Sequence, residues 1–489
     1  MPHVETFYQP SLTDVRSQFI APVEPSRNVF LSTLFAALEG NDVRYCVLHC
    51  SRGLVYAFEI AVHPEDVSKL ALAFESVAQT GYCPIQAVNL ADGRKRLVFG
   101  SVVDEVLETI TLDVIFKNQT ALACTSPESL INRRERSYSF WRPQLQDAFA
   151  VLLAEAVFSD DPNERVLARL ETVAGAMGKR ATEAVLREIF GSQWGEKAAT
   201  GFHNSRLLDF IRDFRTALRS RIVPRETRSK SFLRQKADEK TGGNGAFLVF
   251  LGPDGVGKTT LLQEVRQSLA TAFAQQSLYR WRPGVFAKTP RAACLPHSKP
   301  LRSTQGSISY LFFTWIDFVA GHLLKTRSQM SRYGLVIFDR YYHDIGVDPK
   351  RYRYNGPMGL VRWLGRTIPP GQVFFFVLDA DEAAILSRKQ QLPIDEIRRQ
   401  RAAYREFARS TPNSVVINTD GSIANCRAQA LRAILPYLAA QTAKRNPCWF
   451  GTFMKVQKRV PLENLHNASA RESSATSKPA AEVSSKASA

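Results

Sequence analysis

Apolar and polar positions follow two patterns in the second half of the chain. Short continuous apolar runs at 246–251, 335–338 and 373–378 are typical of strands buried in a parallel sheet. Between these runs, apolar residues recur every three or four positions, which predicts helices. Because strands and helices alternate from Ala246 to about Ala443, residues 246–443 are predicted to form an α/β domain with a parallel sheet and flanking helices.

The first half of the chain predicts a smaller α/β domain at 28–140, followed by a helical extension at 141–222. Apolar runs at 43–49, 55–62 and 109–116 predict strands, and the segment after the second run predicts a helix and a turn. In the extension, apolar residues at helical spacing are expected in the core, against the sheet or between the domains. These residues are Phe149, Leu152, Leu153, Val157, Leu207, Phe210, Ile211 and Phe214.

Three segments lack such patterns. Residues 1–27 are predicted to be an irregular arm, and the charged segment 223–245, which ends in glycines, is predicted to be a linker. Residues 444–489 are predicted to be a tail, largely disordered from about 463 because Ser, Ala and Lys offer little apolar surface to bury.

The composition has more basic than acidic residues, and it limits the classes of protein to which the chain can belong. The chain has 64 Lys and Arg against 46 Asp and Glu, and this net charge of +18 favours polyanionic partners: nucleotides, nucleic acid or an anionic membrane. Hydrophobic residues at 45% exclude a wholly disordered or fibrous chain. Seven scattered Cys disfavour a disulfide framework. Without an apolar leader or a stretch of about 18 apolar residues, we expect a cytoplasmic protein with no transmembrane segment.

The strongest chemical motif follows the first buried run of the second domain. Residues 252–260 fit the Walker A pattern G-x-x-x-x-G-K-[ST], with a predicted strand before them and a predicted helix after them. This context argues against a chance match in a turn. The candidate nucleotide-binding residues are Gly252, Asp254, Gly255, Val256, Gly257, Lys258, Thr259 and Thr260.

The residue types in this motif suit a bound triphosphate. Gly255 and Gly257 let successive backbone N–H groups point at phosphate oxygens, and the helix N-terminus adds its positive dipole end. Lys258 is a candidate catalytic cation at the β- and γ-phosphates and is expected to face the ligand rather than to pack in the core. The Thr259 hydroxyl can ligate Mg²⁺. The motif therefore predicts ATP and Mg²⁺ as cofactors.

A second motif, Asp339-Arg340-Tyr341, stands at the end of the next buried run. The carboxyl ends of parallel strands form the edge where ligands bind in α/β sheets, so Asp339 is a candidate for Mg²⁺ and Arg340 for a phosphate. A purely structural Asp–Arg pair is the alternative. Neither an Asp-Glu strand end nor an LSGGQ-like signature is present, so an ABC-type ATPase is not indicated.

With these residues the segment from about 245 to 438 resembles thymidylate kinases and related nucleoside monophosphate kinases. The resemblance implies that Asp254 lies near the acceptor sugar and that Arg340 and Tyr341 bind the acceptor. The candidate catalytic residues are Lys258, Asp339 and Arg340. The resemblance also implies a lid after the strand 373–379, with Arg388, Arg398 and Arg401 as candidate lid cations, although an Arg-rich helix can simply be a solvated face. The same resemblance implies a homodimer.

Two features depart from that family. The family's Arg-Glu-Pro-Gly run reads Arg282-Pro283-Gly284 here, so Arg282 is a candidate acceptor contact that lacks the usual Glu beside it. Residues 285–306 form a long basic insertion, and the basic and aromatic segment 343–357 is either a specificity loop or a surface loop. Thymidylate itself is therefore not predicted as the acceptor.

The order of strands in the first domain resembles the nucleotidyltransferase fold. In that fold a D-x-D pair and a third Asp hold two Mg²⁺ ions. Here Ala57-Phe58-Glu59 stands in place of the pair, Asp113 is the candidate third carboxylate, and the Gly-Ser position at 50–53 is not convincing. We therefore predict a degenerate domain that serves as a scaffold or binding domain.

Two classes of function remain open. The first is a phosphotransferase that moves the γ-phosphoryl group of ATP to a nucleoside monophosphate or another phosphorylated small molecule. The second is an ATP-binding regulatory or assembly module with little turnover. Nucleic-acid binding is not excluded, but charge alone supports it.

Overall fold

The structure, a computed structural model, describes residues 25–451 except 52–55, 91–93, 118–124, 138–139, 159–163, 223–244, 287–298, 369, 371 and 390–391. The predicted tail from 452 on, nearly all of the predicted arm and linker, and the middle of the basic insertion lie outside the described residues. So do the last two residues of the 50–53 position. The tail prediction is wrong for its first residues, because 444–450 belong to two helices, Ile423–Arg445 and Pro447–Phe450, and Phe450 is buried.

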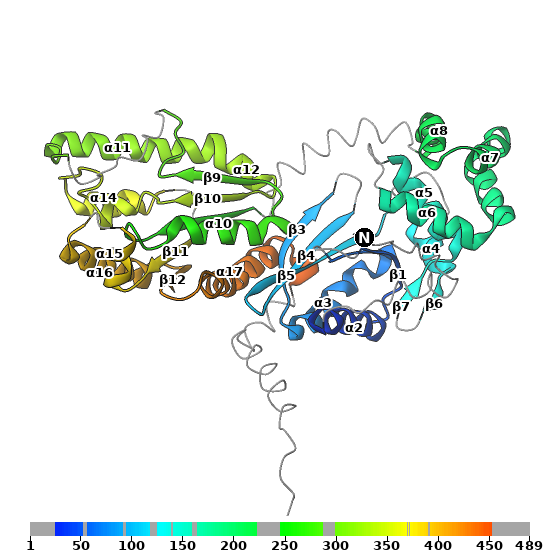
Figure 1. Ribbon diagram of the computed structural model, residues 1–489, viewed down its shortest axis with the longest axis horizontal. Helices are drawn as coiled ribbons and strands as arrows, with labels where there is room; N and C mark the ends of the chain where they lie inside the picture. The colour runs from blue at the N-terminus through cyan, green and yellow to red at the C-terminus, as the bar shows by residue number, and fades with distance from the viewer. Residues whose placement is uncertain are drawn as a thin grey trace, which may run out of the picture.

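A five-stranded parallel sheet forms the centre of the second half among the described residues (Figure 1). Its order is β12-β11-β8-β10-β9, and the strands are β8 (Ala246–Leu251), β9 (Gln276–Arg280), β10 (Leu335–Asp339), β11 (Phe374–Asp379) and β12 (Ser414–Asn418). Every residue of β8 is buried, because a strand lies on each side of it and helices cover both faces. The three predicted apolar runs are thus β8, β10 and β11.

Side chains of β8 alternate between two cores. Leu248 and Phe250 point to one face, where they pack with α10 (Lys258–Ser268) and α17 (Ile423–Arg445). Phe247 and Val249 point to the other face, which α11 (Thr304–Gly321) and α14 (Met358–Gly365) cover. The remaining helices of this half are α12 (Arg327–Ser331), α13 (Asp344–Val347), α15 (Glu382–Arg388), α16 (Ile394–Ser410) and α18 (Pro447–Phe450), with short 3-10 turns between some elements.

One long helix meets the length and mean hydropathy of a membrane span, although no such stretch was expected from the sequence. It comprises α11, a π-helical turn at His322–Thr326 and α12, and it is the single such helix among the described residues. One third of its most apolar window is buried. Leu311 and Phe318 on one face belong to the core of the domain, and a core helix can satisfy the same criterion.

The first half contains a mixed five-stranded sheet of order β1-β2-β5-β4-β3. Strands β2 and β5 are parallel and the other pairs are antiparallel. Its elements are α2 (Pro25–Gly40), β1 (Tyr45–Ser51), β2 (Tyr56–Val62), α3 (Leu70–Val77), β3 (Cys83–Asn89), β4 (Lys95–Val103) and β5 (Val106–Ile115). The predicted α/β character is confirmed, whereas a nucleotidyltransferase-like fold stays a hypothesis.

A helical group follows this sheet. After α4 (Pro127–Asn132) and the short strands β6 (Glu135–Ser137) and β7 (Phe140–Arg142) come α5 (Leu145–Phe158), α6 (Glu164–Met177), α7 (Lys179–Asn204) and α8 (Leu207–Ile222). The eight apolar residues predicted for its core are all buried. They form a cluster among the helices themselves, rather than packing on the sheet or between domains.

Helix α17 lies between the two sheets (Figure 1). It packs against β11 and β12 on one side and against β3 and β4 on the other, and Cys83 Sγ lies 3.8 Å from the Leu435 carbonyl oxygen. Beyond it, the Phe450 ring of α18 packs against Phe74 and Phe99 of the first sheet's core. A single hydrophobic cluster therefore extends through both halves of the molecule.

Candidate active site

The Walker A segment forms a tight loop between β8 and α10. Gly252, Gly255 and Gly257 have φ angles of +146°, +88° and +94°, a region that residues with a Cβ rarely adopt. A Cβ on Gly252 would lie 2.7 Å from the Leu378 carbonyl oxygen, so β11 also leaves no room for a side chain there. The loop thus has the curled backbone predicted from its glycines, directly before the N-terminus of α10.

Lys258 is buried in this structure, at 8% exposure. Its Nζ donates hydrogen bonds to the carbonyl oxygens of Gly252 (2.8 Å) and Pro253 (2.6 Å). The expectation that Lys258 stands free toward a ligand is therefore wrong for this state of the chain. Burial, reinforced by the nearby charge of Arg340, lowers the pKa of Lys258 to about 7 despite three acidic neighbours.

The two candidate Mg²⁺ residues occupy adjacent elements. Thr259 and Thr260 are exposed in the first turn of α10, and Asp339 is the last residue of β10, which pairs with β8 beside the loop. Among the described residues no group of three or more His, Cys, Asp or Glu could hold a metal. A hydroxyl and one carboxylate fit Mg²⁺, which usually takes one or two protein oxygens and fills its shell with phosphate oxygens and water.

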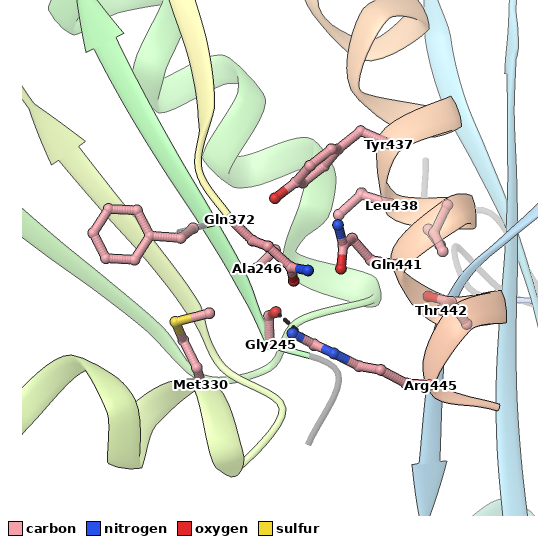
Figure 2. A pocket seen from close by; sticks show the side chains of 11 residues that line it. Gly245, Ala246, Met330, Gln372, Tyr437, Leu438, Gln441, Thr442 and Arg445 are labelled. Carbon is pink, nitrogen blue, oxygen red and sulfur yellow. Dashed lines mark hydrogen bonds between the residues drawn. The ribbon is translucent and has the colours of Figure 1, made fainter. Parts of the chain in front are cut away.

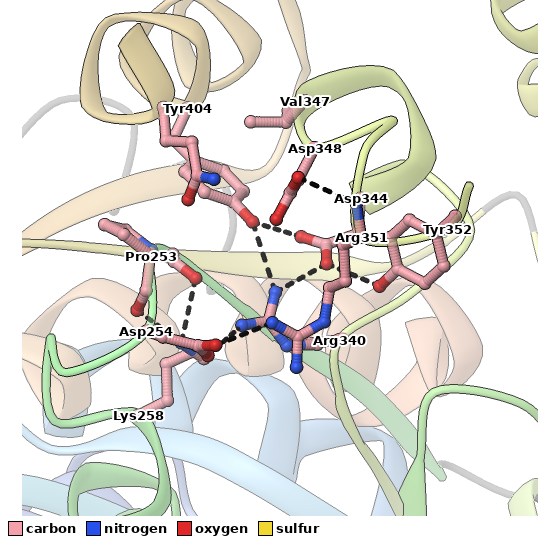
Figure 3. Close-up of polar contacts among 12 residues, drawn as sticks. Pro253, Asp254, Lys258, Arg340, Asp344, Val347, Asp348, Arg351, Tyr352 and Tyr404 are labelled. Carbon is pink, nitrogen blue, oxygen red and sulfur yellow. Dashed lines mark hydrogen bonds and ion pairs between the residues drawn. The ribbon is translucent and has the colours of Figure 1, made fainter. Parts of the chain in front are cut away.

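Arg340 is the centre of a buried polar cluster beside the loop (Figure 3). Its Nη2 donates to Asp254 Oδ1 (2.5 Å) and its Nη1 to Asp344 Oδ2 (2.6 Å). The hydroxyl groups of Tyr352 and Tyr404 also donate to Asp344. The positive φ of Arg340, 71°, is a strained conformation of the kind that functional sites retain.

Arg351, which was not singled out from the sequence, completes this cluster. Its Nη1 donates to Asp254 Oδ2 (2.6 Å), so two guanidinium groups bind one carboxylate (Figure 3). Burial alone would raise the pKa of Asp254, but the charges of Arg340, Lys258 and Arg351 hold it far below its usual range. The basic and aromatic character of 343–357 was the available signal for Arg351.

The other candidate acceptor residues make different contacts. The Tyr341 ring is 1% exposed and packs edge-on against Phe247 and Phe338 in the core. Arg282 Nε lies 3.9 Å from Asp317 Oδ2 on α11. Their roles toward an acceptor stay predictions, and the burial of Tyr341 does not support its role.

The candidate lid arginines divide into two groups. Arg388 at the end of α15 donates to the Thr419 carbonyl oxygen (3.0 Å), and the Thr419 hydroxyl donates to the Val256 carbonyl oxygen of the loop (2.7 Å). Arg398 and Arg401 on α16 instead pair with Glu382 (2.8 Å) and with Asp379 (2.7 Å). Arg388 therefore lies beside the phosphate loop, whereas Arg398 and Arg401 form ion pairs with carboxylates outside the loop.

In the first half, the two remaining carboxylates of the hypothesised nucleotidyltransferase site are neighbours. Glu59 on β2 and Asp113 on β5 are register partners in the parallel pair. Arg94 binds Glu59 (2.7 Å), and Arg96 binds both oxygens of Asp113 (2.8 and 2.7 Å). Since guanidinium groups already balance both charges, these residues do not fit a two-metal site.

A small pocket lies far from the loop, where β8 begins (Figure 2). It is bounded by Gly245, Met330 and Gln372 on one side and by Tyr437 and Arg445 of α17 on the other. Arg445 Nη1 donates to the Gly245 carbonyl oxygen (3.2 Å). Because the phosphate loop follows the opposite end of β8, this pocket is separate from the candidate active site.

Comparisons with known proteins add little to this geometry. No known family profile matches the sequence, and no curated protein matches it. Among solved structures, the chain is similar to the crystal structure of thymidylate kinase from Ehrlichia chaffeensis, with 16% identity and a TM-score of 0.29. That match covers 39% of this chain and 98% of the other. A likeness at this TM-score decides neither fold nor function.

The topology and the loop define the class of fold directly. A parallel sheet with β8 at its centre, a glycine loop after β8 and a helix that begins at Lys258 make the second half a P-loop-like α/β domain.

Proposed function

We propose that this protein is an ATP-dependent phosphotransferase whose acceptor is a nucleoside monophosphate or another phosphorylated small molecule. The observation that carries the proposal is the position of the Arg340–Arg351–Asp254 cluster against the phosphate loop. Asp254 belongs to the loop itself, so an anion held by the two arginines would lie beside a triphosphate held by the loop. A donor phosphate and an acceptor phosphate need such neighbouring anion sites.

The chain's own residues supply positioning and charge. The backbone N–H groups of the loop and of the first turn of α10 would bind the β-phosphate, and Lys258 would turn from the Gly252 and Pro253 carbonyl groups toward the γ-phosphate. Thr259 and Asp339 would hold Mg²⁺, which would supply positive charge against the phosphates when bound. Arg388 lies where a third cation could reach the transferred group.

A second function is favoured by one specific observation. In this state Lys258 is held by backbone carbonyls, and both cluster arginines are held by Asp254, so every cation needed for transfer already has a partner. An ATP-binding regulatory or assembly module could use the same loop as a switch with little turnover. A homodimer and a cytoplasmic location stay predictions.

The test is ATP consumption with Mg²⁺ against a panel of dTMP, other nucleoside monophosphates and phosphorylated sugars. We expect turnover with one class of acceptor, and Lys258→Ala should lower it by about 10²–10³-fold because it removes the charge at the transferred group. Lys197→Ala, an exposed lysine on α7, is the matched control and should leave the rate unchanged. ATP binding without turnover on any acceptor would instead support the switch.

Arg351 offers a separate test of the acceptor side. Arg351→Gln should raise the KM for the acceptor by about tenfold, because it removes one charge-assisted contact, while the KM for ATP changes little. Steady-state kinetics with each substrate varied in turn would show the split. An equal rise in both KM values would indicate that Arg351 supports the loop rather than the acceptor.

A further inference from the structure

A stripe of apolar side chains is exposed along the helix from Thr304 to Ser331. Phe313, Ile316, Leu323 and Leu324 are 70%, 41%, 56% and 68% exposed, and Phe312 borders them at 41%. Their helical spacing places them together on the side opposite the buried residues Leu311, Thr314 and Phe318. Single exposed apolar residues are ordinary, but a contiguous stripe marks a surface that is covered when the protein works.

The charged residues in the sequence segment that contains this stripe are nearly all basic. Residues 280–338 contain nine Lys and Arg and a single acidic residue, Asp317. Asp317 is 1% exposed and accepts hydrogen bonds from the backbone N–H groups of Gly284, Val285 and Phe286. Arg327 and Arg332, by contrast, are exposed at the C-terminal end of the stripe. No carboxylate of this segment therefore faces solvent beside the apolar side chains.

We propose that this surface docks the protein on an anionic lipid membrane. We call it the α11 stripe: Phe312, Phe313, Ile316, Leu323, Leu324, Arg327 and Arg332. Apolar side chains that enter the headgroup boundary and arginines that contact lipid phosphates are the two contributions that bind amphipathic helices to such surfaces. A second copy of the chain is the alternative occupant of an apolar stripe, and the test below separates it from a membrane.

The helix would lie on the membrane rather than cross it. Its other face is fixed to the domain, since Phe318 packs against Phe338 and Tyr341 of the central sheet region. The backbone bonds to Asp317 hold the preceding loop against the same face. A membrane span would have to break these contacts, whereas docking through the exposed stripe keeps them.

Flotation of the full chain with lipid vesicles tests the proposal, and it does not depend on the kinase activity. We expect binding to phosphatidylcholine vesicles that contain about 30% phosphatidylglycerol and little binding to phosphatidylcholine alone. The double variant Phe313→Ser/Leu324→Ser, and separately Arg327→Glu/Arg332→Glu, should each weaken binding by about tenfold or more. Leu208→Ser, at a 48% exposed leucine on α8, is the matched control and should bind as the original chain does.

Two outcomes would overturn the proposal. One is equal recovery with both vesicle types, or none with either, for a folded chain shown by circular dichroism. The other is a concentration-dependent dimer in analytical ultracentrifugation that the Phe313→Ser/Leu324→Ser variant abolishes, which would assign the stripe to a second copy. Rates of ATP turnover in solution should be unchanged in these variants, so a failure here is distinguishable from failure of the proposed function.

Discussion

At the scale of single residues, Asp344 organises the candidate acceptor site. Its carboxylate is fully buried and accepts hydrogen bonds from Arg340, Tyr352 and Tyr404. Burial by itself would raise its pKa, yet the Arg340 charge and the two hydroxyl groups keep the pKa below its usual range. Asp344 therefore fixes the position of the Arg340 guanidinium group. Asp254 binds this group and also the guanidinium group of Arg351.

This arrangement predicts a large stability effect for a conservative change. Asp344→Asn should lower the free energy of unfolding by about 3 kcal/mol, because it leaves the buried Arg340 without one of its two counter-charges. Urea unfolding at neutral pH measures the effect. Asp395→Asn, at a 90% exposed side chain on α16, is the matched control and should cost less than about 0.5 kcal/mol. Similar values for the two variants would mean that Asp344 is not essential to the cluster.

Local spacing revealed some of these residues and not others. The glycines of 252–257 and Lys258 could be predicted because the backbone conformation and the cation that such a loop requires come from residues close together in the sequence. Arg351 and Asp344 could not, since Arg351 meets Asp254 across 97 positions of the chain. Lys258 was placed correctly in the loop, but its bonds to two carbonyls depend on how the loop folds, which a motif does not encode.

At the scale of elements, the position of a strand in the sheet decided whether the sequence predicted it. Central β8, β10 and β11 were predicted because burial on both faces requires continuous apolar runs. Edge strands β9 and β12 were not, because half-exposed sequences such as QSLYR carry no such run. Helices were predicted between the apolar runs, but the bounds of the long helix α11 were not, since the segment before it is basic and irregular.

One element, the short helix α13, carries a pH-sensitive contact at its start. His343 packs between the rings of Phe375 and Phe407, and this enclosure lowers its pKa to about 4. Because the unfolded chain binds this proton near pH 6.5, stability is lost as the pH falls from about 6.5 toward 4. Between pH 7 and pH 5 the loss should be about 2 kcal/mol larger for the original chain than for His343→Phe.

Urea unfolding of the original chain and the His343→Phe variant at pH 7 and pH 5 isolates the contribution of His343, because all other titratable groups are the same in the two proteins. An equal loss in the two chains would show that His343 is protonated in the folded state as easily as in the unfolded state.

At the scale of the whole molecule, α17 and α18 make one folded unit of the two sheets. Lys95 Nζ on β4 donates to Asn446 Oδ1 between these helices (2.7 Å), and Gln86 Nε2 on β3 donates to the Tyr333 carbonyl oxygen (3.3 Å). Such contacts are invisible to motif analysis, which divided the chain by composition into consecutive domains.

This shared core predicts that a change in α18 destabilises the first sheet. Phe450→Ala should lower the free energy of unfolding by about 3–4 kcal/mol, because the ring is fully buried against Phe74 and Phe99. Phe286→Ala, at a 66% exposed ring, should cost less than about 0.5 kcal/mol. Calorimetry should show one transition for the original chain; two separate transitions would mean that the sheets unfold independently.

The packing of α17 on β3 also bears on how the chain is made. Cys83 and Leu435 are neighbours in space but 352 residues apart, so the ribosome adds the covering helix long after the first sheet has emerged. At roughly 5–20 residues per second, the apolar face of that sheet would wait on the order of 20–70 seconds for its partner. During synthesis this face therefore stays uncovered, and a chaperone would have a surface to bind there.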